Sequence, residues 1–155
     1  MTELVRRATT TDIPALVELR AVMIESIFDG PSGDDWRDEC ARVLQRRLAD
    51  TDGFAAFVVD GADGVPVACG IGWVEQHLPG PRNLSGRFGH IASMSTLPEH
   101  RGQGYARLVL GALMDWYAEI GVPRVHLNAA PMGERLYREM GFTDRQMPAL
   151  TSTRP

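Results

Sequence analysis

The stretch Pro98-Glu99-His100-Arg101-Gly102-Gln103-Gly104-Tyr105-Ala106-Arg107 decides the fold of this 155-residue chain. A strand-like apolar run over residues 88–96 precedes it, and the apolar spacing over residues 104–120 predicts an amphipathic helix after it. The two glycines allow a sharp turn and leave room for a ligand close to the backbone. The first turn of a helix has N–H groups without partners, and the helix dipole favours an anion there. The sequence therefore predicts a phosphate-binding turn.

Two common nucleotide-binding patterns do not fit this spacing. A Walker loop needs a lysine and a hydroxyl residue directly after its last glycine, whereas Gly104 is followed by Tyr105 and Ala106. A Rossmann fingerprint needs a third glycine, close to the first strand, and Arg107 stands at that position late in the chain. A nucleotide-binding regulatory domain is therefore the weaker alternative.

A different family fits two segments of the chain. The pattern Arg101-x-x-Gly104-x-Ala106 resembles the pyrophosphate-binding motif of the GNAT N-acetyltransferase superfamily. Residues 136–142, Leu-Tyr-x-x-Met-Gly-Phe, look like the GNAT segment in which a tyrosine lies beside the sulfur of acetyl-CoA. The order and separation of both motifs within residues 88–142 also agree with that family. The resemblance implies a GNAT-like fold and acetyl-CoA as the co-substrate.

Apolar periodicity and turn residues predict the order of elements. We expect one domain over residues 1–155, with Asp12 capping the first helix. The expected strands cover 5–8, 54–59, 65–74, 88–96 and 123–129, with helices from about 14, from about 34, over 104–120 and from about 133, and a possible strand pair after Phe142. This order, β-α-α-β-β-β-α-β-α-β(β), predicts an α/β fold with a mixed central sheet of six to seven strands and helices on both faces. It is also the GNAT order.

Composition excludes several classes of partner. A net charge of −4 gives no electrostatic reason to expect nucleic-acid binding. There is no apolar run long enough for a membrane span, and residues 1–5 do not resemble a signal peptide, so we expect a cytoplasmic protein. Cys40 and Cys69 are isolated, and no histidine has a metal-ligand spacing to them. We therefore expect reduced packing thiols and no metal.

The resemblance implies which residues contact acetyl-CoA. The pyrophosphate would lie on the amides of residues 102–107, with Gln103 and Tyr105 pointing outward. The pantetheine arm would pair with the free edge of the strand that precedes the turn. The implied contacts are Met94, Ser95, Thr96, Arg101, Gly102, Gln103, Gly104, Tyr105, Ala106, Arg107 and Asn128. The Asn-rich turn found in many members is replaced here by the shorter residues 129–133.

Acetyl transfer to an amine needs a base for the amine and a proton for the departing thiolate. The Tyr137 hydroxyl, with an ordinary pKa of ~10, suits the second task, although packing alone would also explain it. Glu75 is the leading candidate for the base, because no acid occupies residues 89–97, where many members carry one. Ser93 and Ser95 stand there and could orient water. Two histidines, His90 and His126, and the absence of any dedicated base remain alternatives.

The acceptor is the least determined part. The resemblance implies a groove with Glu25, Phe28 and Asp29 on one side and Trp73 on the other, a set that suits a cationic amine. The expected reaction is acetyl transfer to a primary amine of a small molecule or amino acid, by direct attack in a ternary complex. Acetylation of a protein N-terminus or lysine, and a non-catalytic acyl-CoA-binding module, are the alternatives. Whether two copies form a homodimer stays open.

Overall fold

The computed structural model describes residues 4–155, so residues 1–3, where the expected domain begins, lie outside the described part. Its centre is a five-stranded sheet in the spatial order β1-β2-β3-β4-β5. The strands are β1 (Val5–Arg7), β2 (Phe54–Asp60), β3 (Pro66–Gln76), β4 (Arg87–Thr96) and β5 (Val125–Leu127). Neighbours from β1 to β4 are antiparallel, and β5 is parallel to β4. The sheet is therefore mixed, as predicted.

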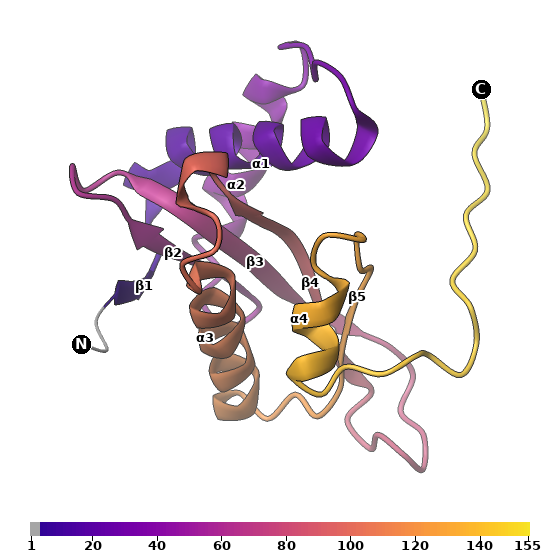
Figure 1. The fold of residues 1–155 in the computed structure, drawn as a ribbon. Coiled ribbons are helices and arrows are strands. Elements are labelled where there is room, and N and C mark those ends of the chain that lie inside the picture. The colour runs from indigo at the N-terminus through magenta and orange to yellow at the C-terminus, as the bar shows by residue number, and fades with distance from the viewer. Residues whose placement is uncertain (1–3) are drawn as a thin grey trace.

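Helices cover both faces of this sheet (Figure 1). On one face lie α1 (Ile13–Phe28) and α2 (Arg37–Arg47), and on the other α3 (Tyr105–Glu119) and the short α4 (Glu134–Glu139). Each face has its own apolar core: one joins α1 and α2 to β2 and β3, and the other joins α3 and Tyr137 of α4 to the sheet. Short 3₁₀ turns, Thr10–Asp12 and Pro98–His100, precede α1 and α3.

The start of α1 differs from the expectation for Asp12. Pro14 occupies the first turn, as predicted. The Asp12 carboxylate does not cap α1: it accepts two hydrogen bonds from the Arg6 guanidinium (2.8 and 2.9 Å) and one from the Thr9 N–H (2.8 Å). The two bonds from the Arg6 guanidinium form a bidentate ion pair, which is stronger than a single bond to a backbone N–H, and the pair directs this carboxylate towards β1.

Tyr117 of α3 explains two glycines in the middle of the sheet. A Cβ at Gly72 would lie 2.5 Å from its Oη, and a Cβ at Gly89 would lie 2.5 Å from its ring. The hydroxyl lies 3.0 Å from the carbonyl oxygens of Trp73 and His90, on neighbouring strands, and burial raises its pKa. Glycines on β3 and β4 thus let one aromatic side chain fix α3 against both strands.

The strands expected after Phe142 are not present. Residues 143–155 form neither helix nor strand, so the described sheet has five strands instead of six to seven. Figure 1 shows this segment running beside the body of the protein and then away from it. Pro148 and Pro155 lack a backbone donor, and every residue from 143 to 155 is exposed. The segment therefore gains neither ladder bonds nor burial within its own chain.

Three further findings on the described residues concern the thiols, groups that could hold a metal ion, and the length of the helices. Cys40 and Cys69 are free, and complete burial raises the pKa of the Cys69 thiol to about 12, so it remains a protonated packing group. Within residues 4–155, no group of three or more His, Cys, Asp or Glu side chains is arranged to hold a metal ion. None of the helices in that range has the length and apolar character needed to cross a membrane.

Candidate active site

The strands β4 and β5 separate beyond a short region of pairing. Their register joins Gly89, His90 and Ile91 to Val125, His126 and Leu127, whereas β4 continues to Thr96. Residues 92–96 therefore present a backbone edge on the β5 side without a partner strand among the described residues. Met94, Ser95 and Thr96 belong to this edge, which is open to an amide-bearing ligand that extends the strand.

A β-bulge distorts β4 at the same place. Cys69 pairs with Ser95 and Ile71 with Ala92, so that Ser93 and Met94 lie opposite the single residue Gly70. The backbone of Ser93 adopts the left-handed conformation, with a φ of 53°. Such bulges re-aim backbone groups, and the strained residue persists only when its surroundings hold it.

The contacts that hold this bulge come from α1 and β3. Arg20 donates to Ser93 Oγ (2.6 Å), Ser95 Oγ donates to the Leu19 carbonyl (2.7 Å), and the Cys69 thiol bonds to the Ser93 carbonyl (3.3 Å). Both hydroxyls proposed for orienting water are thus bonded to α1. This role could not be predicted from the sequence, because the partners on α1 lie more than 70 positions away from the two serines.

The glycine turn forms an open cradle at the start of α3. Gly102 and Gly104 have φ values of 80° and 82°, and a Cβ at either would meet no atom within 4 Å. No side chain caps the N-terminus of α3. Arg101 donates to the Thr96 carbonyl (3.1 Å) and to Ser26 Oγ (3.3 Å), which ties the turn to β4 and α1. Free amides and the space above them fit a phosphate group.

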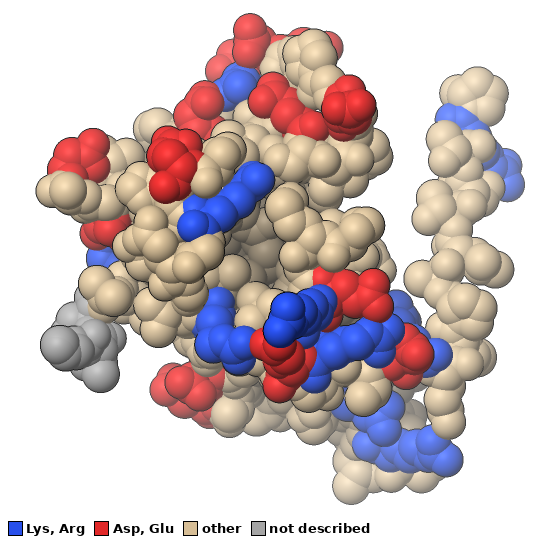
Figure 2. Space-filling view, in the orientation of Figure 1, with Lys and Arg blue, Asp and Glu red and all other residues tan. Residues whose placement is uncertain are grey.

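The charged and polar side chains around the turn only partly match the expectation. Gln103 is exposed, as predicted, whereas Tyr105 is half-buried against the α3 core. Arg107 is paired with Glu139 of α4, and both side chains are about half exposed. An exposed pair of this kind contributes little to stability, so a phosphate can compete for Arg107. Figure 2 shows a surface hollowed between α1, α3 and α4, with basic side chains along its border.

Tyr137 is both a packing residue and a cavity residue. It is 8% exposed within the α3-side core, its ring meets Phe142 edge-on at 6.1 Å, and Gly133 leaves room for it. Tyr137 and Asn128 also line one cavity of about 520 Å³. Burial raises the pKa of Tyr137, which keeps the hydroxyl protonated at neutral pH, as a proton donor requires.

Glu75 lies on the opposite face of the sheet from Tyr137. Residues 71, 73 and 75 alternate onto the α1-side face, where Ile71 and Trp73 pack. Both Glu75 carboxylate oxygens have partners: His77 Nε2 lies 3.1 Å from Oε1, and Trp73 Nε1 donates to Oε2 (3.2 Å). Both contacts lower the pKa of Glu75, and the hydrogen bond with His77 has the larger effect. A carboxylate stabilised in this way is a weaker base than an ordinary one.

Three of the chain's four histidines gather on this same face. His90 lies 5.0 Å from the Trp73 ring, and Phe88 lies 4.7 Å from His77 and 5.1 Å from His126 between ring centres. Burial, more than the nearby cations, lowers the pKa of His126, so it is neutral at pH 7. The sequence did not reveal this cluster, because the strand register that brings the histidines together is not local.

The residues expected to line the acceptor groove have structural partners. The Glu25 carboxylate accepts hydrogen bonds from the Ser32 N–H (3.2 Å) and hydroxyl (3.1 Å), closing the loop after α1. Asp29 ends α1 in the left-handed region, and Phe28 is 74% exposed. The acidic side chains of this region gather over α1 and α2 in Figure 2.

Trp73 packs against residues outside the loop that follows α1. It stacks on Phe54 at 6.4 Å, and the Arg47 guanidinium covers its ring at 5.7 Å. Its remaining neighbours, His90 and Glu75, connect it to the histidine cluster. Trp73 therefore belongs with Glu75, whereas Glu25, Phe28 and Asp29 belong to the α1–α2 connection.

Comparison with known proteins identifies the family. The family model described as Acetyltransferase (GNAT) family matches residues 21–142, which include the glycine turn, the bulge and Tyr137. Among curated proteins, no sequence is a significant match.

Solved structures share the fold over nearly the whole chain. A predicted acetyltransferase from Clostridium acetobutylicum, solved with acetyl-CoA, is 25% identical with a TM-score of 0.86, covering 96% of this chain and 94% of that one. A GCN5-related N-acetyltransferase from Ralstonia eutropha JMP134 is 23% identical (TM-score 0.81; 96% and 97% covered). Glucosamine-6-phosphate N-acetyltransferase from Arabidopsis thaliana is 20% identical (TM-score 0.76; 96% of each chain covered).

Proposed function

This chain belongs to the GNAT acetyltransferase family, and we propose that it transfers the acetyl group of acetyl-CoA to a primary amine of a small molecule or amino acid. The observation that carries the proposal is the open glycine turn at the start of α3, beside the unpaired edge of β4. The first provides amides for a pyrophosphate, and the second provides amides for a pantetheine arm. The A. thaliana enzyme, named for a phosphorylated amino sugar, makes a small acceptor the first choice.

Acetyl-CoA would bind along these two features. Its pyrophosphate would contact the amides of residues 102–107, with Arg101 and Arg107 near the negative charge. Its pantetheine arm would pair with the edge of Met94, Ser95 and Thr96, and Asn128 would contact it from the end of β5. The bulge would direct a backbone amide of Met94 or Ser95 towards the thioester, where that amide would stabilise the developing oxyanion.

The chemistry then divides between the two faces of the sheet. The neutral amine attacks the thioester carbonyl, the C–N bond forms, and the C–S bond breaks with its electron pair going to sulfur. Tyr137, kept protonated by burial on the α3 side, would supply the proton that the thiolate takes up. The amine's own proton leaves on the other side.

Glu75 is the proposed acceptor of that proton, acting with His77. Its lowered pKa favours a carboxylate that attracts the ammonium form of the amine, and the hydrogen-bonded His77 provides an exit for the proton. Neutral His126 and neighbouring His90 lie on the same face and are the alternative bases. The acids Glu25 and Asp29, with Phe28, would line the far side of the acceptor groove.

Release of free thiol from acetyl-CoA in the presence of a panel of primary amines tests this proposal. Acetylated product from at least one small amine supports it, and product from peptides alone would move the acceptor class to protein N-termini or lysines. If acetyl-CoA bound but released no thiol in the presence of any amine tested, the protein would instead be a non-catalytic acyl-CoA-binding module.

A further inference from the structure

Arg20 of α1 is a half-buried cation whose bonding partner is neutral. Its guanidinium donates to Ser93 Oγ (2.6 Å), and it forms no ion pair with another residue in the range 4–155. The arginines that do pair with carboxylates are Arg6, Arg37, Arg42, Arg107, Arg135 and Arg138. Moving a charge partly out of water without an opposite charge costs free energy, so the stability of the fold alone does not account for this contact.

The residue that Arg20 holds is the strained residue of the β4 bulge. Ser93 is buried, and its φ of 53° is one that residues other than glycine rarely adopt. Its hydroxyl accepts the bond from Arg20, and its carbonyl accepts one from the Cys69 thiol (3.3 Å). A hydrogen bond from a charged donor is stronger than a neutral one. Arg20 therefore supplies the stronger of the two contacts that hold Ser93 in this conformation.

These two contacts fix the direction of one backbone amide. A peptide unit is planar and trans, so the Met94 N–H points opposite to the Ser93 carbonyl. Because that carbonyl faces Cys69 of β3, the Met94 N–H is directed away from β3. The side of β4 away from β3 is the unpaired edge beside β5.

The pairing of β4 with β3 leaves the same amide available. The Leu97 N–H donates to the Val67 carbonyl of β3 (2.9 Å). Backbone groups alternate sides along a strand, so Ser95, which pairs with Cys69, also directs its N–H to β3. Of the two amides considered for the oxyanion, that of Met94 is therefore the one that the sheet does not use.

The helix α1 holds β4 on both sides of Met94. Arg20 binds Ser93, and the carbonyl of the preceding residue, Leu19, accepts a bond from Ser95 Oγ (2.7 Å). We propose that Arg20 is a positioning residue for acetyl transfer: through Ser93 it keeps the Met94 N–H directed at the oxyanion. This role rests on the proposed acetyl transfer, and it requires no contact between Arg20 and acetyl-CoA or the amine.

Arg20→Gln tests this role by separating kcat from binding. Removing an oxyanion donor costs about 10²–10³-fold in kcat, so a misdirected donor should cost about tenfold or more. The KM of the amine and the acetyl-CoA affinity, measured by calorimetric titration, should stay unchanged. Arg20→Lys keeps a charged donor and should recover part of the loss. A wild-type kcat in Arg20→Gln, or a loss that appears only as weaker acetyl-CoA binding, would overturn the proposal.

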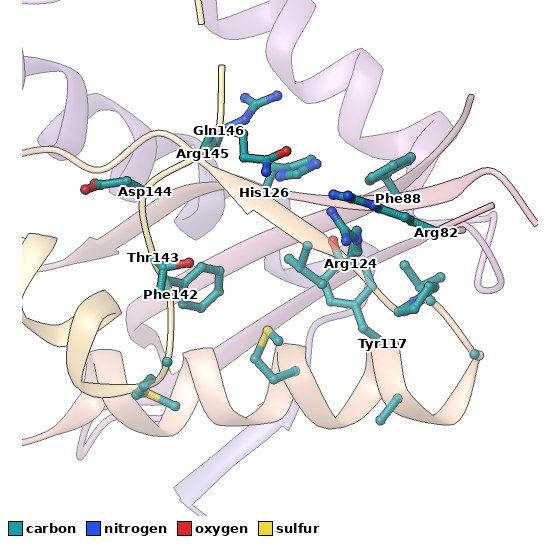
Figure 3. Close-up of a pocket in the computed structure, with 18 of the residues that line it drawn as sticks. Arg82, Phe88, Tyr117, Arg124, His126, Phe142, Thr143, Asp144, Arg145 and Gln146 are labelled. Carbon is teal, nitrogen blue, oxygen red and sulfur yellow. The ribbon is translucent and has the colours of Figure 1, made fainter. Parts of the chain in front are cut away.

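Arg82→Gln is a matched control for the lost charge. Figure 3 shows Arg82 at the hollow that Phe88, near the start of β4, also lines. Ser93 lies five residues beyond Phe88 along the strand, or about 16 Å. The control should therefore keep the wild-type kcat. A loss equal to that of Arg20→Gln would attribute the effect to net charge and contradict a role through Ser93.

A double-variant cycle measures whether Arg20 acts through Ser93. Glycine adopts a positive φ without strain, so Ser93→Gly removes only the anchored hydroxyl. Its kcat should fall as in Arg20→Gln, and the double variant should lose no more than either single variant. Losses that multiply in the double variant would mean that the two residues act independently, which contradicts the proposal.

The bound thioester gives a readout that needs no acceptor. Isotope-edited infrared spectra of acetyl-CoA labelled at the acetyl carbonyl report the hydrogen bond to that oxygen. The carbonyl band of the Arg20→Gln complex should be broader, and lie at a higher wavenumber, than that of the wild-type complex. Identical bands would overturn the role of Arg20 alone, whereas a wild-type protein that binds no acetyl-CoA would overturn the proposed function as well.

Discussion

At the scale of single residues, Tyr137 combines a packing role with a proposed chemical one, and one substitution separates them. Tyr137→Phe keeps the ring against Phe142 and removes only the hydroxyl. If that hydroxyl protonates the thiolate, turnover should fall by ~10²–10⁴-fold while acetyl-CoA affinity stays unchanged. Thiol release and calorimetric titration measure the two quantities. Turnover at the wild-type rate would leave Tyr137 as a packing residue.

A substitution at Glu75 distinguishes a catalytic base from a group that only binds the amine. Glu75→Gln should lower kcat if the carboxylate accepts the proton, and raise only KM if it merely attracts the amine. Both quantities come from thiol-release kinetics with a small-amine acceptor. Unchanged kinetics would remove Glu75 from the mechanism.

His77→Gln tests the same carboxylate through its pKa. The bond to His77 is the main cause of the lowered pKa of Glu75, so its loss should let that pKa rise. Since the charged form is the active one, the rate of the variant should begin to fall at a higher pH than that of the wild type. The pH profile of kcat/KM measures this, and an unmoved acid limb would exclude Glu75 as the titrating group.

At the scale of elements, the strand–turn–helix around residues 98–107 is where the sequence was most informative. Its signals are local: two glycines with positive φ between an apolar strand and an amphipathic helix. The β4 bulge and the histidine cluster could not be predicted in this way, because both depend on which residues lie opposite one another on separate strands. The strand pair expected after Phe142 is absent, because a strand forms only where a neighbouring strand accepts its bonds, and residues 143–155 have none within the described sheet.

The turn itself gives the sharpest element-scale prediction. Gly104→Glu puts a side chain and a negative charge in the cradle, and should weaken acetyl-CoA binding at least tenfold, or ~1.4 kcal/mol. Gly121→Glu is a matched control, because Gly121 also has a positive φ (73°) and open space but lies at the other end of α3. Calorimetric titration should show normal affinity for the control. Equal affinities in both folded variants would contradict the phosphate site.

The junction of α3 with the sheet predicts a specific coupling. Gly72→Ala places a Cβ against the Tyr117 hydroxyl, and Gly89→Ala places one against the ring. Each should destabilise the protein by ~1–3 kcal/mol in chemical denaturation. Adding Tyr117→Phe should recover part of the loss for Gly72→Ala, since the nearest atom is then gone, but little for Gly89→Ala. If Tyr117→Phe recovered the same stability in both double variants, the Tyr117 side chain would be shifting as a whole to make room for the added methyl group, rather than meeting it at the hydroxyl.

At the scale of the whole molecule, one ion cluster joins the first strand, the first helix and the second strand. Arg6 of β1 binds Asp12, at the start of α1, and Asp60, at the end of β2. Asp12 is only 6% exposed, so its charge is compensated mainly by Arg6. The cluster therefore fixes the edge of the sheet farthest from the proposed active site, and changes in it should alter stability and leave the site's chemistry intact.

This location leads to a prediction about acid stability. The Arg6 hydrogen bonds, as the largest cause, lower the pKa of Asp12 below its ordinary 3.8 in the folded protein. The stabilisation that the charged Asp12 contributes is therefore complete above the ordinary pKa of 3.8. It is lost as the pH falls from there through the lower pKa of the folded protein. Asp12→Asn lacks the charge at every pH, so denaturant unfolding should show wild type more stable by ~1–3 kcal/mol at pH 7, with the difference shrinking below about pH 4. A difference that stays constant from pH 7 to pH 3 would mean that Asp12 stabilises the fold through shape and neutral hydrogen bonds rather than through its charge.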